Sequence, residues 1–562
     1  MKAAPLQASA TQIDQTDAAH AVKEHSSTPR KVSHVEPQGF WSKRRRNASD
    51  GEKRFDPMWY WVIGFLVFYF IFCVYWITII PMCKAPDEVV RIPVSDYIMK
   101  YGHLPNAWEE MVRIHNWGFS YALRPILANT ISALFMWIAS LFSGDLWVQV
   151  IAGRLVSAIS ATVLVYYMFR IARELKWSWP WAWGVAAFTG LIPQVTFLSS
   201  YINNDIFSMA CCAAVIFAWV KGIKTKWSWK ACIRLSITLG VTILSYYNAY
   251  PYVLFSIPLF FMTIFHKGMT KEEKKTAWKK TGLIVLVTFL LAGWWFIRNI
   301  VLYDGDMLGS QTREIMGEMY AYDGLKPSQV RSLKRDGVPY LAVIRSNLLR
   351  DPWWLITFRS AYASVGFVEL YLDSLLPYKI MGWIFIIGWV VAFIRWMTVF
   401  VQSCIAKFKD HEKNMELIFY FFVVLSAILV FFLAVYYSWA DDYQPQGRYV
   451  LPALASFMLV MFYGGQWICG IVQLPFKNRR IRESIAAVFC ACLIAFNVTS
   501  QIRIIQLTHA RFDSVPRIFS EYVDHRIKFG PEFETDGNGH TVEEYPSVRD
   551  EIISAENAAS PQ

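Results

Sequence analysis

A long apolar run near the N-terminus sets the main constraint on this chain. The 27 residues Pro57–Cys83 contain no charged side chain. The hydrocarbon core of a bilayer is about 30 Å thick, so about 20 residues of helix cross it. Similar runs recur, and the chain is only 17% charged while holding 25 Trp and 40 Phe. Because only helices and closed barrels satisfy their backbone hydrogen bonds within lipid, the sequence predicts an all-α, polytopic transmembrane protein.

Clusters of Lys and Arg predict the topology. "WSKRRRN" (41–47) precedes the first apolar run, whereas connections such as "SSYINND" (199–205) carry no basic residue. Cytoplasmic loops are enriched in Lys and Arg, so we expect a cytoplasmic N-terminus. Counting crossings between the basic clusters predicts about eleven spans, over residues 58–81, 147–169, 177–198, 206–220, 231–248, 251–265, 281–302, 380–400, 417–438, 449–470 and 484–502.

This topology divides the chain into three parts. Residues 1–56 form a basic, largely disordered cytoplasmic tail, 57–505 a transmembrane domain, and 506–562 a polar extracytoplasmic tail. The first apolar run is too long for a signal peptide. Two long outer loops, 82–146 and 303–379, are expected to form a site.

The first outer loop is expected to hold membrane-parallel helices. Its polar segments are helix-compatible, and residues 119–142 are apolar. We expect 119–142 to lie along the outer interface, because a span there would place the basic cluster Arg170–Lys176 outside. A membrane-spanning 119–142 is the alternative.

Charge and cysteine content bear on two further classes of protein. The formal net charge of +12 follows the topology signal, which disfavours nucleic-acid binding. The nine Cys residues lack CxxC and Cys/His ligand spacing, so the sequence supports neither a disulfide framework nor a zinc site.

Polar residues gather at the predicted outer ends of spans. Each has an ordinary interpretation, as a helix N-cap or as an interfacial arginine. Together, carboxylates and arginines at the membrane edge suit an anionic lipid-linked substrate, since guanidinium groups bind phosphate and a carboxylate accepts a proton from a hydroxyl. The residues are Asp87 and Glu88, Asn204 and Asp205, Arg298 and Asp306, and Gln446, Arg448 and Tyr449, with His115 in the first loop.

Five sequence blocks resemble the GT-C superfamily of membrane glycosyltransferases. They are "PDEVVRIPVSDYIMKYGHLP", the segment from "SYALRPIL" to "RIARELKW", "YINNDIFSM", "GWWFIRNIVLYDGDMLG" and "QGRYVLPAL". The last three resemble blocks that recur in the bacterial branch, which includes the lipid A aminoarabinose transferase and relatives of protein O-mannosyltransferases. The resemblance covers roughly residues 57–505 and implies a GT-C fold, a polyprenyl-phosphate-linked sugar donor and inversion at the anomeric carbon.

The resemblance also implies roles for residues. Asp87 is expected to be the general base with Glu88 as its partner, Asn204 and Asp205 to orient the acceptor or a metal, and Arg448 and Arg298 to bind the donor phosphate. His115, Tyr449, Gln446 and Asp306 are candidates for the substrate cavity. A divalent metal is left open as a cofactor, because "RPIL" replaces a Pro-Pro pair common in relatives and a strong second acidic motif is missing.

The expected function is therefore a multi-pass glycosyltransferase of the bacterial plasma membrane. It moves a hexose or pentose to a hydroxyl of a cell-envelope glycan, lipid or protein on the outer face. A transporter or flippase, or a polymerase or ligase of lipid-linked saccharides, is the alternative. The sugar, the acceptor and the oligomeric state are not specified by the sequence.

Overall fold

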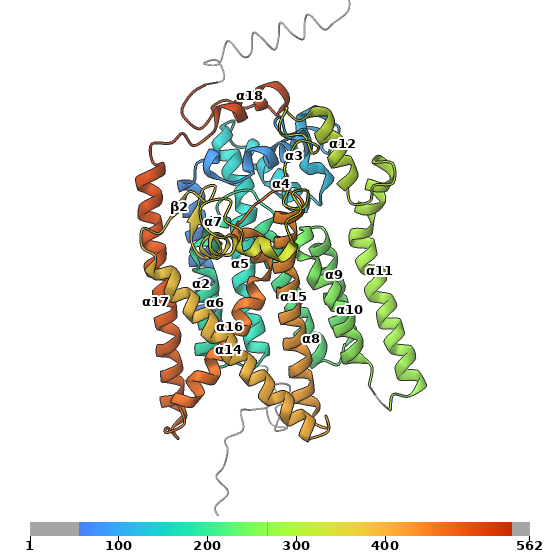
Figure 1. Cartoon of the computed structure of the whole chain (residues 1–562), viewed down its shortest axis with the longest axis vertical. Coiled ribbons are helices and arrows are strands. Elements are labelled where there is room, and N and C mark those ends of the chain that lie inside the picture. Colours follow the sequence, from blue (N-terminus) through green and yellow to red (C-terminus); the bar gives the residue numbers. More distant parts are fainter. Residues whose placement is uncertain (1–55, 267, 542–562) are drawn as a thin grey trace, which may run out of the picture.

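The fold is a bundle of α-helices. The computed structural model describes residues 56–266 and 268–541, and within them the only sheet is the antiparallel pair β1 (Ser364–Val365) and β2 (Leu370–Tyr371) (Figure 1). The predicted all-α polytopic class is confirmed. Of the predicted N-terminal tail, 1–56, only Asp56 lies within the described residues.

Eight helices in the described residues are long and apolar enough to cross a membrane. Each coincides with a span predicted from sequence. They are α2 (Met58–Ile79), α5 (Leu146–Glu174), α8 (Asp205–Lys224), α11 (Lys271–Leu302), α14 (Leu376–Ile405), α15 (His411–Ala440), α16 (Leu454–Val472) and α17 (Arg479–Phe512).

The other three predicted spans are shorter helices. Residues 177–198 form α6 (Trp179–Gly190) and α7 (Pro193–Leu198), and residues 231–265 form α9 (Trp229–Ile243) and α10 (Tyr250–Ile264). Both α9 and α10 have 15 residues, about 22 Å at 1.5 Å per residue, which is less than the hydrocarbon core. They nevertheless lie beside the long helices in the bundle (Figure 1).

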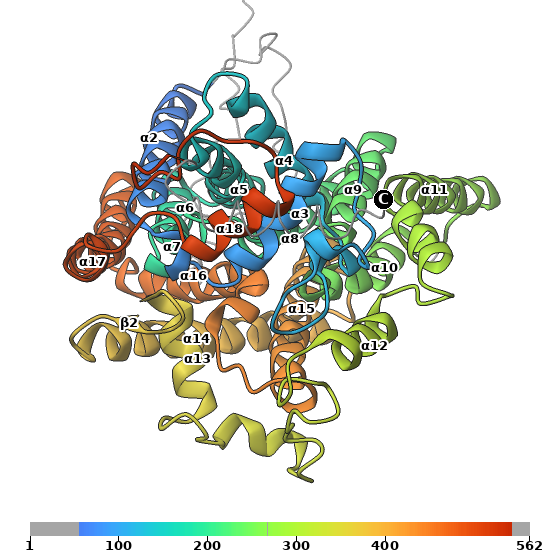
Figure 2. The same cartoon turned by 90° about the horizontal axis from the view of Figure 1, so that it is seen from above.

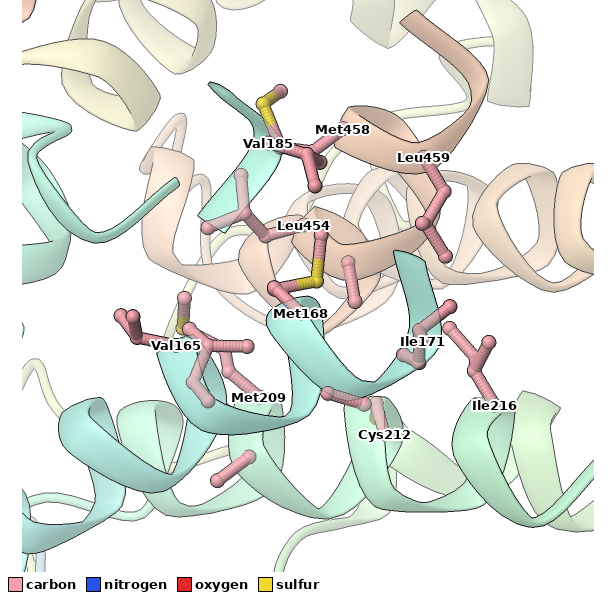
Figure 3. Close-up of a cluster of buried hydrophobic side chains, with 14 of the residues drawn as sticks. Val165, Met168, Ile171, Val185, Met209, Cys212, Ile216, Leu454, Met458 and Leu459 are labelled. Carbon is pink, nitrogen blue, oxygen red and sulfur yellow. The ribbon is translucent and has the colours of Figure 1, made fainter. Parts of the chain in front are cut away.

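The centre of the bundle is built around α8. In the apolar 18-residue stretch of α8, 89% of the residues are buried, whereas in that of α14 only 11% are. Helix α8 therefore lies inside the bundle and α14 at its periphery. The small residues Ala210–Ala214 let neighbouring helices approach closely. Met209 and Cys212 of α8 pack with Met168 of α5 and Met458 of α16 in this core (Figure 3).

One end of the bundle carries most of the shorter helices, and we call it the site end. It holds α3 (Glu88–Tyr101), α4 (Leu127–Ser140) and α12 (Ser310–Tyr320), with α13 (Trp353–Tyr362) nearby (Figures 1 and 2). The 14 residues of α4 span about 21 Å, too little to cross the hydrocarbon core. The apolar stretch 119–142 is therefore not a full span of its own.

The predicted C-terminal tail, 506–562, begins inside a helix. α17 continues to Phe512, and a further helix, α18 (Ser520–Phe529), lies across α3 at the site end (Figure 2). Arg526 of α18 makes a fully buried ion pair with Asp96 of α3 (Nη1 to Oδ1, 2.8 Å) and donates to Gln149 of α5 at 2.7 Å. This C-terminal segment thus fastens α3 to the bundle.

Candidate functional site

Asp87 occupies the N-cap position of α3, but its side chain does not cap the helix. It makes no hydrogen bond to the first turn, and its backbone is left-handed with a φ of 61°. A missing cap costs about 1 kcal/mol, and left-handed backbone at a non-glycine residue costs about 1 kcal/mol or more. The carboxylate Oδ2 instead lies 2.9 Å from Nη1 of Arg448 and 3.4 Å from Nη2 of Arg91. The local structure favours these two contacts over capping.

Arg448 lies in the tight turn Gly447–Tyr449 between α15 and α16, and its side chain is buried. Nη2 donates to the Tyr449 hydroxyl at 3.0 Å. The backbone N–H of Gly447 donates to the Ser360 hydroxyl of α13 at 2.7 Å. A Cβ at Gly447 would lie 2.0 Å from the backbone nitrogen of Ala361. The close approach of α13 therefore requires glycine here and fixes the position of Arg448.

Arg91 lies one helical turn after Asp87 and was not among the residues predicted from sequence. Its guanidinium stacks on the ring of Tyr121, with 4.9 Å from Cζ to the ring centroid. Nε and Nη1 are buried and have no hydrogen-bond partner among the described residues. Arg124, also not predicted, lies within electrostatic range of Asp87. The i, i+4 spacing of Asp87 and Arg91 on a helix is the sequence signal that could have predicted their contact.

Asp205 and Asn204 lie at the start of α8, and Asp205 lies within electrostatic range of Arg448 and Arg91. Asp205 is 1% exposed, and within the described residues neither of its carboxylate oxygens has a hydrogen-bond partner. Oδ1 of Asn204 is also unpartnered there, while Asn203 accepts the N–H of Ile206 at 3.0 Å. The capping role that sequence allowed for Asn204 and Asp205 thus belongs to Asn203, and the buried acceptors of the other two remain available.

The electrostatics of the cluster keep Asp87 ionised. Burial alone raises the pKa of Asp87, but the guanidinium groups of Arg448 and Arg91 outweigh it and hold the pKa below the usual range. Asp205 lies within electrostatic range of the same two arginines. With Arg124, three guanidinium groups face two carboxylates, which leaves an excess of positive charge that suits an anionic ligand.

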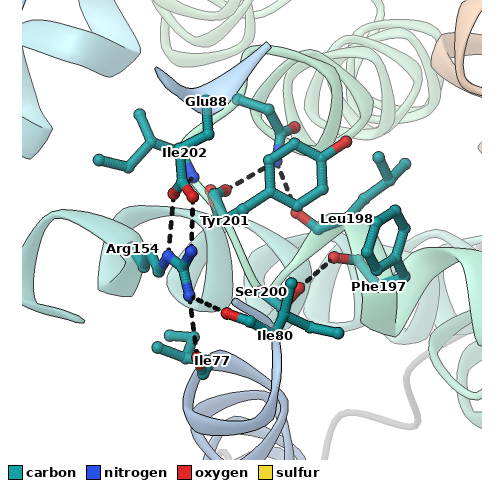
Figure 4. A network of polar contacts seen from close by, with 11 residues as sticks. Ile77, Ile80, Glu88, Arg154, Phe197, Leu198, Ser200, Tyr201 and Ile202 are labelled. Atoms are coloured by element: carbon teal, nitrogen blue, oxygen red, sulfur yellow. Dashed lines mark hydrogen bonds and ion pairs between the residues drawn. The ribbon is translucent and has the colours of Figure 1, made fainter. Parts of the chain in front are cut away.

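Glu88 is adjacent to Asp87 but has a different environment (Figure 4). It is fully buried, and its two oxygens accept from Nε and Nη2 of Arg154 at 2.9 and 2.5 Å. Oε1 also accepts the N–H of Ile202 at 2.8 Å. Arg154 in turn donates to the carbonyls of Ile77 and Ile80. This network joins the end of α2, the start of α3, α5 and the segment before α8, and so positions Asp87 relative to Asp205.

Three other predicted site residues have contacts of their own. Arg298 donates to the carbonyl of Pro105 at 2.5 Å. Asp306 accepts from the backbone N–H groups of Ser310 and Thr312, at the start of α12. The His115 ring is exposed and packs edge-on against Tyr322, with 5.1 Å between centroids.

The structure therefore brings together part of the predicted set. Arg448 pairs with Asp87 and donates to Tyr449, Gln446 precedes their turn, and Asp205 lies within electrostatic range of Arg448. Asn204 adjoins Asp205 in the chain. No group of three or more His, Cys, Asp or Glu side chains placed to hold a metal occurs in the part of the chain that the structure describes.

The chain is similar to two kinds of solved structure. One is ArnT from Cupriavidus metallidurans bound to undecaprenyl phosphate, at 15% identity and a TM-score of 0.40, over 80% of this chain and 77% of that one. The other is the archaeal oligosaccharyltransferase AglB from Archaeoglobus fulgidus. In complex with an inhibitory peptide and a dolichol-phosphate it matches at 11% identity and a TM-score of 0.46, over 79% of this chain and 56% of that one. The chain thus spans little more than half of the AglB chain. Both are GT-C enzymes.

A comparison with curated proteins finds no match. A family model described as "Predicted membrane protein (DUF2142)" matches residues 127–457, more than half of the 562 residues. The matched region includes Asp205 and Arg448 and begins after α3. The chain therefore belongs to the DUF2142 family of predicted membrane proteins.

Proposed function

We propose that this protein is a GT-C type membrane glycosyltransferase that takes its sugar from a polyprenyl-phosphate-linked donor. One observation carries the proposal: the carboxylate of Asp87 lies between two buried guanidinium groups at the site end, beside the unpartnered buried carboxylate of Asp205. A transferase of this kind needs cations for a phosphate, a base for a hydroxyl and acceptors for sugar hydroxyls. The five sequence blocks that resemble GT-C enzymes support the same conclusion.

In the proposed reaction, the lipid phosphate lies against Arg448. Asp87 accepts the proton of the acceptor hydroxyl as that oxygen forms a bond to the anomeric carbon. The bond from this carbon to the phosphate oxygen breaks on the opposite face, so the configuration is inverted. The phosphate departs as an anion and needs no strong acid, and the arginines stabilise its developing charge. Asn204 and Asp205 offer hydrogen-bond acceptors that hold sugar or acceptor hydroxyls in position.

Glu88 has a positioning role in this proposal. Both of its oxygens are already occupied by Arg154 and the backbone of Ile202. It therefore holds the start of α3 in place and does not take part in proton transfer.

The proposed orientation follows from the basic clusters. The site end faces the outside of a bacterial plasma membrane and the N-terminus faces the cytoplasm. The acceptor is a hydroxyl of an envelope glycan, lipid or protein, and the transferred group is a hexose or a pentose.

A donor panel tests the proposal. Purified protein in lipid vesicles is incubated with polyprenyl phosphates that carry different labelled hexoses and pentoses, together with a bacterial envelope extract as acceptor. A glycosyltransferase converts at least one donor to free polyprenyl phosphate and labels the acceptor fraction. A flippase moves the intact donor across the vesicle membrane and releases no polyprenyl phosphate, and that result would overturn the proposal.

A further inference from the structure

The contact of Asp87 with two arginines has the form of an occupied anion site. Arg448, in the turn before α16, and Arg91, in α3, approach the same oxygen, Oδ2 of Asp87. Both guanidinium groups are almost fully buried, with side-chain exposures of 6% and 5%, whereas the Asp87 side chain is 26% exposed. The carboxylate is therefore the accessible partner, and the two arginines form the fixed part of the site.

Asp87 fills this site incompletely. Nε and Nη1 of Arg91 and Nε of Arg448 are buried without a hydrogen-bond partner among the described residues. A buried donor left unpaired is destabilising, and more so when it is charged. A carboxylate offers two oxygens, and the closest contacts of Arg448 and Arg91 both run to the same one, Oδ2. A phosphate offers more acceptor oxygens in a geometry that two guanidinium groups bind well.

We propose that Arg91 and Arg448 together bind the phosphate of the lipid-linked donor, that Asp87 occupies their site in the ligand-free protein, and that the phosphate displaces Asp87 and so frees the base. This inference rests on the proposed function. It adds Arg91 as a phosphate ligand and gives the ion pair of Asp87 a role in the order of binding.

The displacement of Asp87 by the phosphate, which we call the exchange, explains how Asp87 serves as a base. While paired with two cations, its carboxylate is a weak proton acceptor. When the phosphate neutralises the arginines, the carboxylate regains its ordinary basicity and turns toward the acceptor. Asp87 does not cap α3, so this movement breaks no helix-capping hydrogen bond. The base is then active only after the donor is in place, so the donor binds before the acceptor.

The test measures binding of a polyprenyl monophosphate to purified protein in detergent, by native mass spectrometry and by tryptophan fluorescence. Asp87→Asn removes the competing charge and is expected to tighten binding by about two- to fivefold, the size of a partly exposed ion pair. Arg91→Gln is expected to weaken binding at least tenfold, with partial rescue by Arg91→Lys, because a lysine keeps the charge and loses the fork.

Matched controls separate this effect from general electrostatics. Lys84 lies three residues before Asp87 in the chain, and its Nζ is 3.0 Å from Oε1 of Glu369. Glu369→Gln removes this neighbouring carboxylate and is expected to leave the dissociation constant for polyprenyl phosphate unchanged. Polyprenol, phosphatidylglycerol and inorganic phosphate serve as alternative ligands, and each is expected to compete poorly because it lacks either the phosphate or the polyprenyl tail.

The outcomes distinguish the two proposals. Unchanged or weaker binding by Asp87→Asn, in protein that is fully folded at the temperature of the binding measurement, overturns the exchange and leaves the proposed function intact. Failure of the wild-type protein to bind polyprenyl phosphate contradicts both. The exchange is supported if Asp87→Asn increases the affinity for polyprenyl monophosphate in the wild-type background and increases it less in the Arg448→Gln background. The carboxylate and the phosphate compete for Arg448, so the gain depends on that arginine.

Discussion

Oδ2 of Asp87 and Nη1 of Arg448 are 2.9 Å apart, although one residue follows the first membrane-spanning helix and the other precedes α16. Asp87 gives up a helix cap and adopts left-handed backbone to make this contact. Residues that lower the stability of their own helix for a distant polar partner are typical of functional sites.

The pH dependence of stability reports directly on Asp87. Its pKa is lowered in the folded protein, mainly because the arginines outweigh burial, so its contribution is fully present above the ordinary aspartate value of about 3.9. The contribution is lost as the pH falls through the lowered pKa. We expect the difference in unfolding temperature between wild type and Asp87→Asn to be constant above about pH 5 and to shrink below about pH 4. A difference that grows on acidification would contradict the lowered pKa.

Glu88→Gln is expected to damage the fold, in contrast to Asp87→Asn. It leaves the fully buried Arg154 without its anionic partner, which costs about 3 kcal/mol or more. Thermal unfolding in detergent, followed by tryptophan fluorescence, measures this difference. Equal unfolding temperatures for Glu88→Gln and wild type would show that the Glu88–Arg154 network does not hold the start of α3.

Removal of the α18 clamp is expected to loosen α3. Arg526→Gln leaves Asp96 buried without its ion-pair partner, with a cost of about 3–5 kcal/mol. Lys528→Gln is the matched control on the same helix, because Lys528 is 48% exposed and pairs with Glu110 at the surface. Hydrogen exchange of residues 88–101 is expected to rise in Arg526→Gln and to stay at the wild-type level in Lys528→Gln. Equal exchange in the two variants would mean that α18 does not hold α3.

Gly447→Ala is expected to displace Arg448 without unfolding the bundle. The added methyl would overlap the backbone of Ala361, and a shift of about 1 Å at a catalytic group lowers turnover about a hundredfold. Gly470→Ala is the control, because a Cβ there meets nothing within 4 Å. Turnover and unfolding temperature are measured for both. Wild-type turnover in Gly447→Ala would show that the close approach of α13 does not set the position of Arg448.

Sequence reasoning predicted the spans better than the site. Uncharged runs and basic clusters depend on composition over about 20 residues, so they located all eight long helices. The uncharged run 235–265 is shorter than the ~40 residues that two full spans need, and the structure has two 15-residue helices, α9 and α10, over this region. The docking of α18 on α3 was missed because its key contact, Arg526 with Asp96, joins distant parts of the chain and has no local pattern.

Within the site, the sequence indicated Asp87 and Arg448 but not how they pair. Glu88 has the same side-chain chemistry as Asp87, and only the location of Arg154 separates their environments. Arg91 could have been predicted from the sequence, because a helix with Asp87 at its N-cap position places Arg91 one turn after Asp87. Arg298 and Asp306 are polar residues near the ends of spans with contacts away from Asp87: Arg298 donates to the distant carbonyl of Pro105, and Asp306 accepts from the start of α12.

Single-turnover kinetics test the central claim most directly. Wild-type protein and Asp87→Asn are each saturated with the polyprenyl-phosphate-sugar that the donor panel identifies, acceptor is added, and release of polyprenyl phosphate is followed over time. With Asp87 as the base, Asp87→Asn lowers the rate by about 10²- to 10⁴-fold, while its affinity for polyprenyl phosphate is higher than that of the wild type. A rate within a few-fold of wild type would contradict the account.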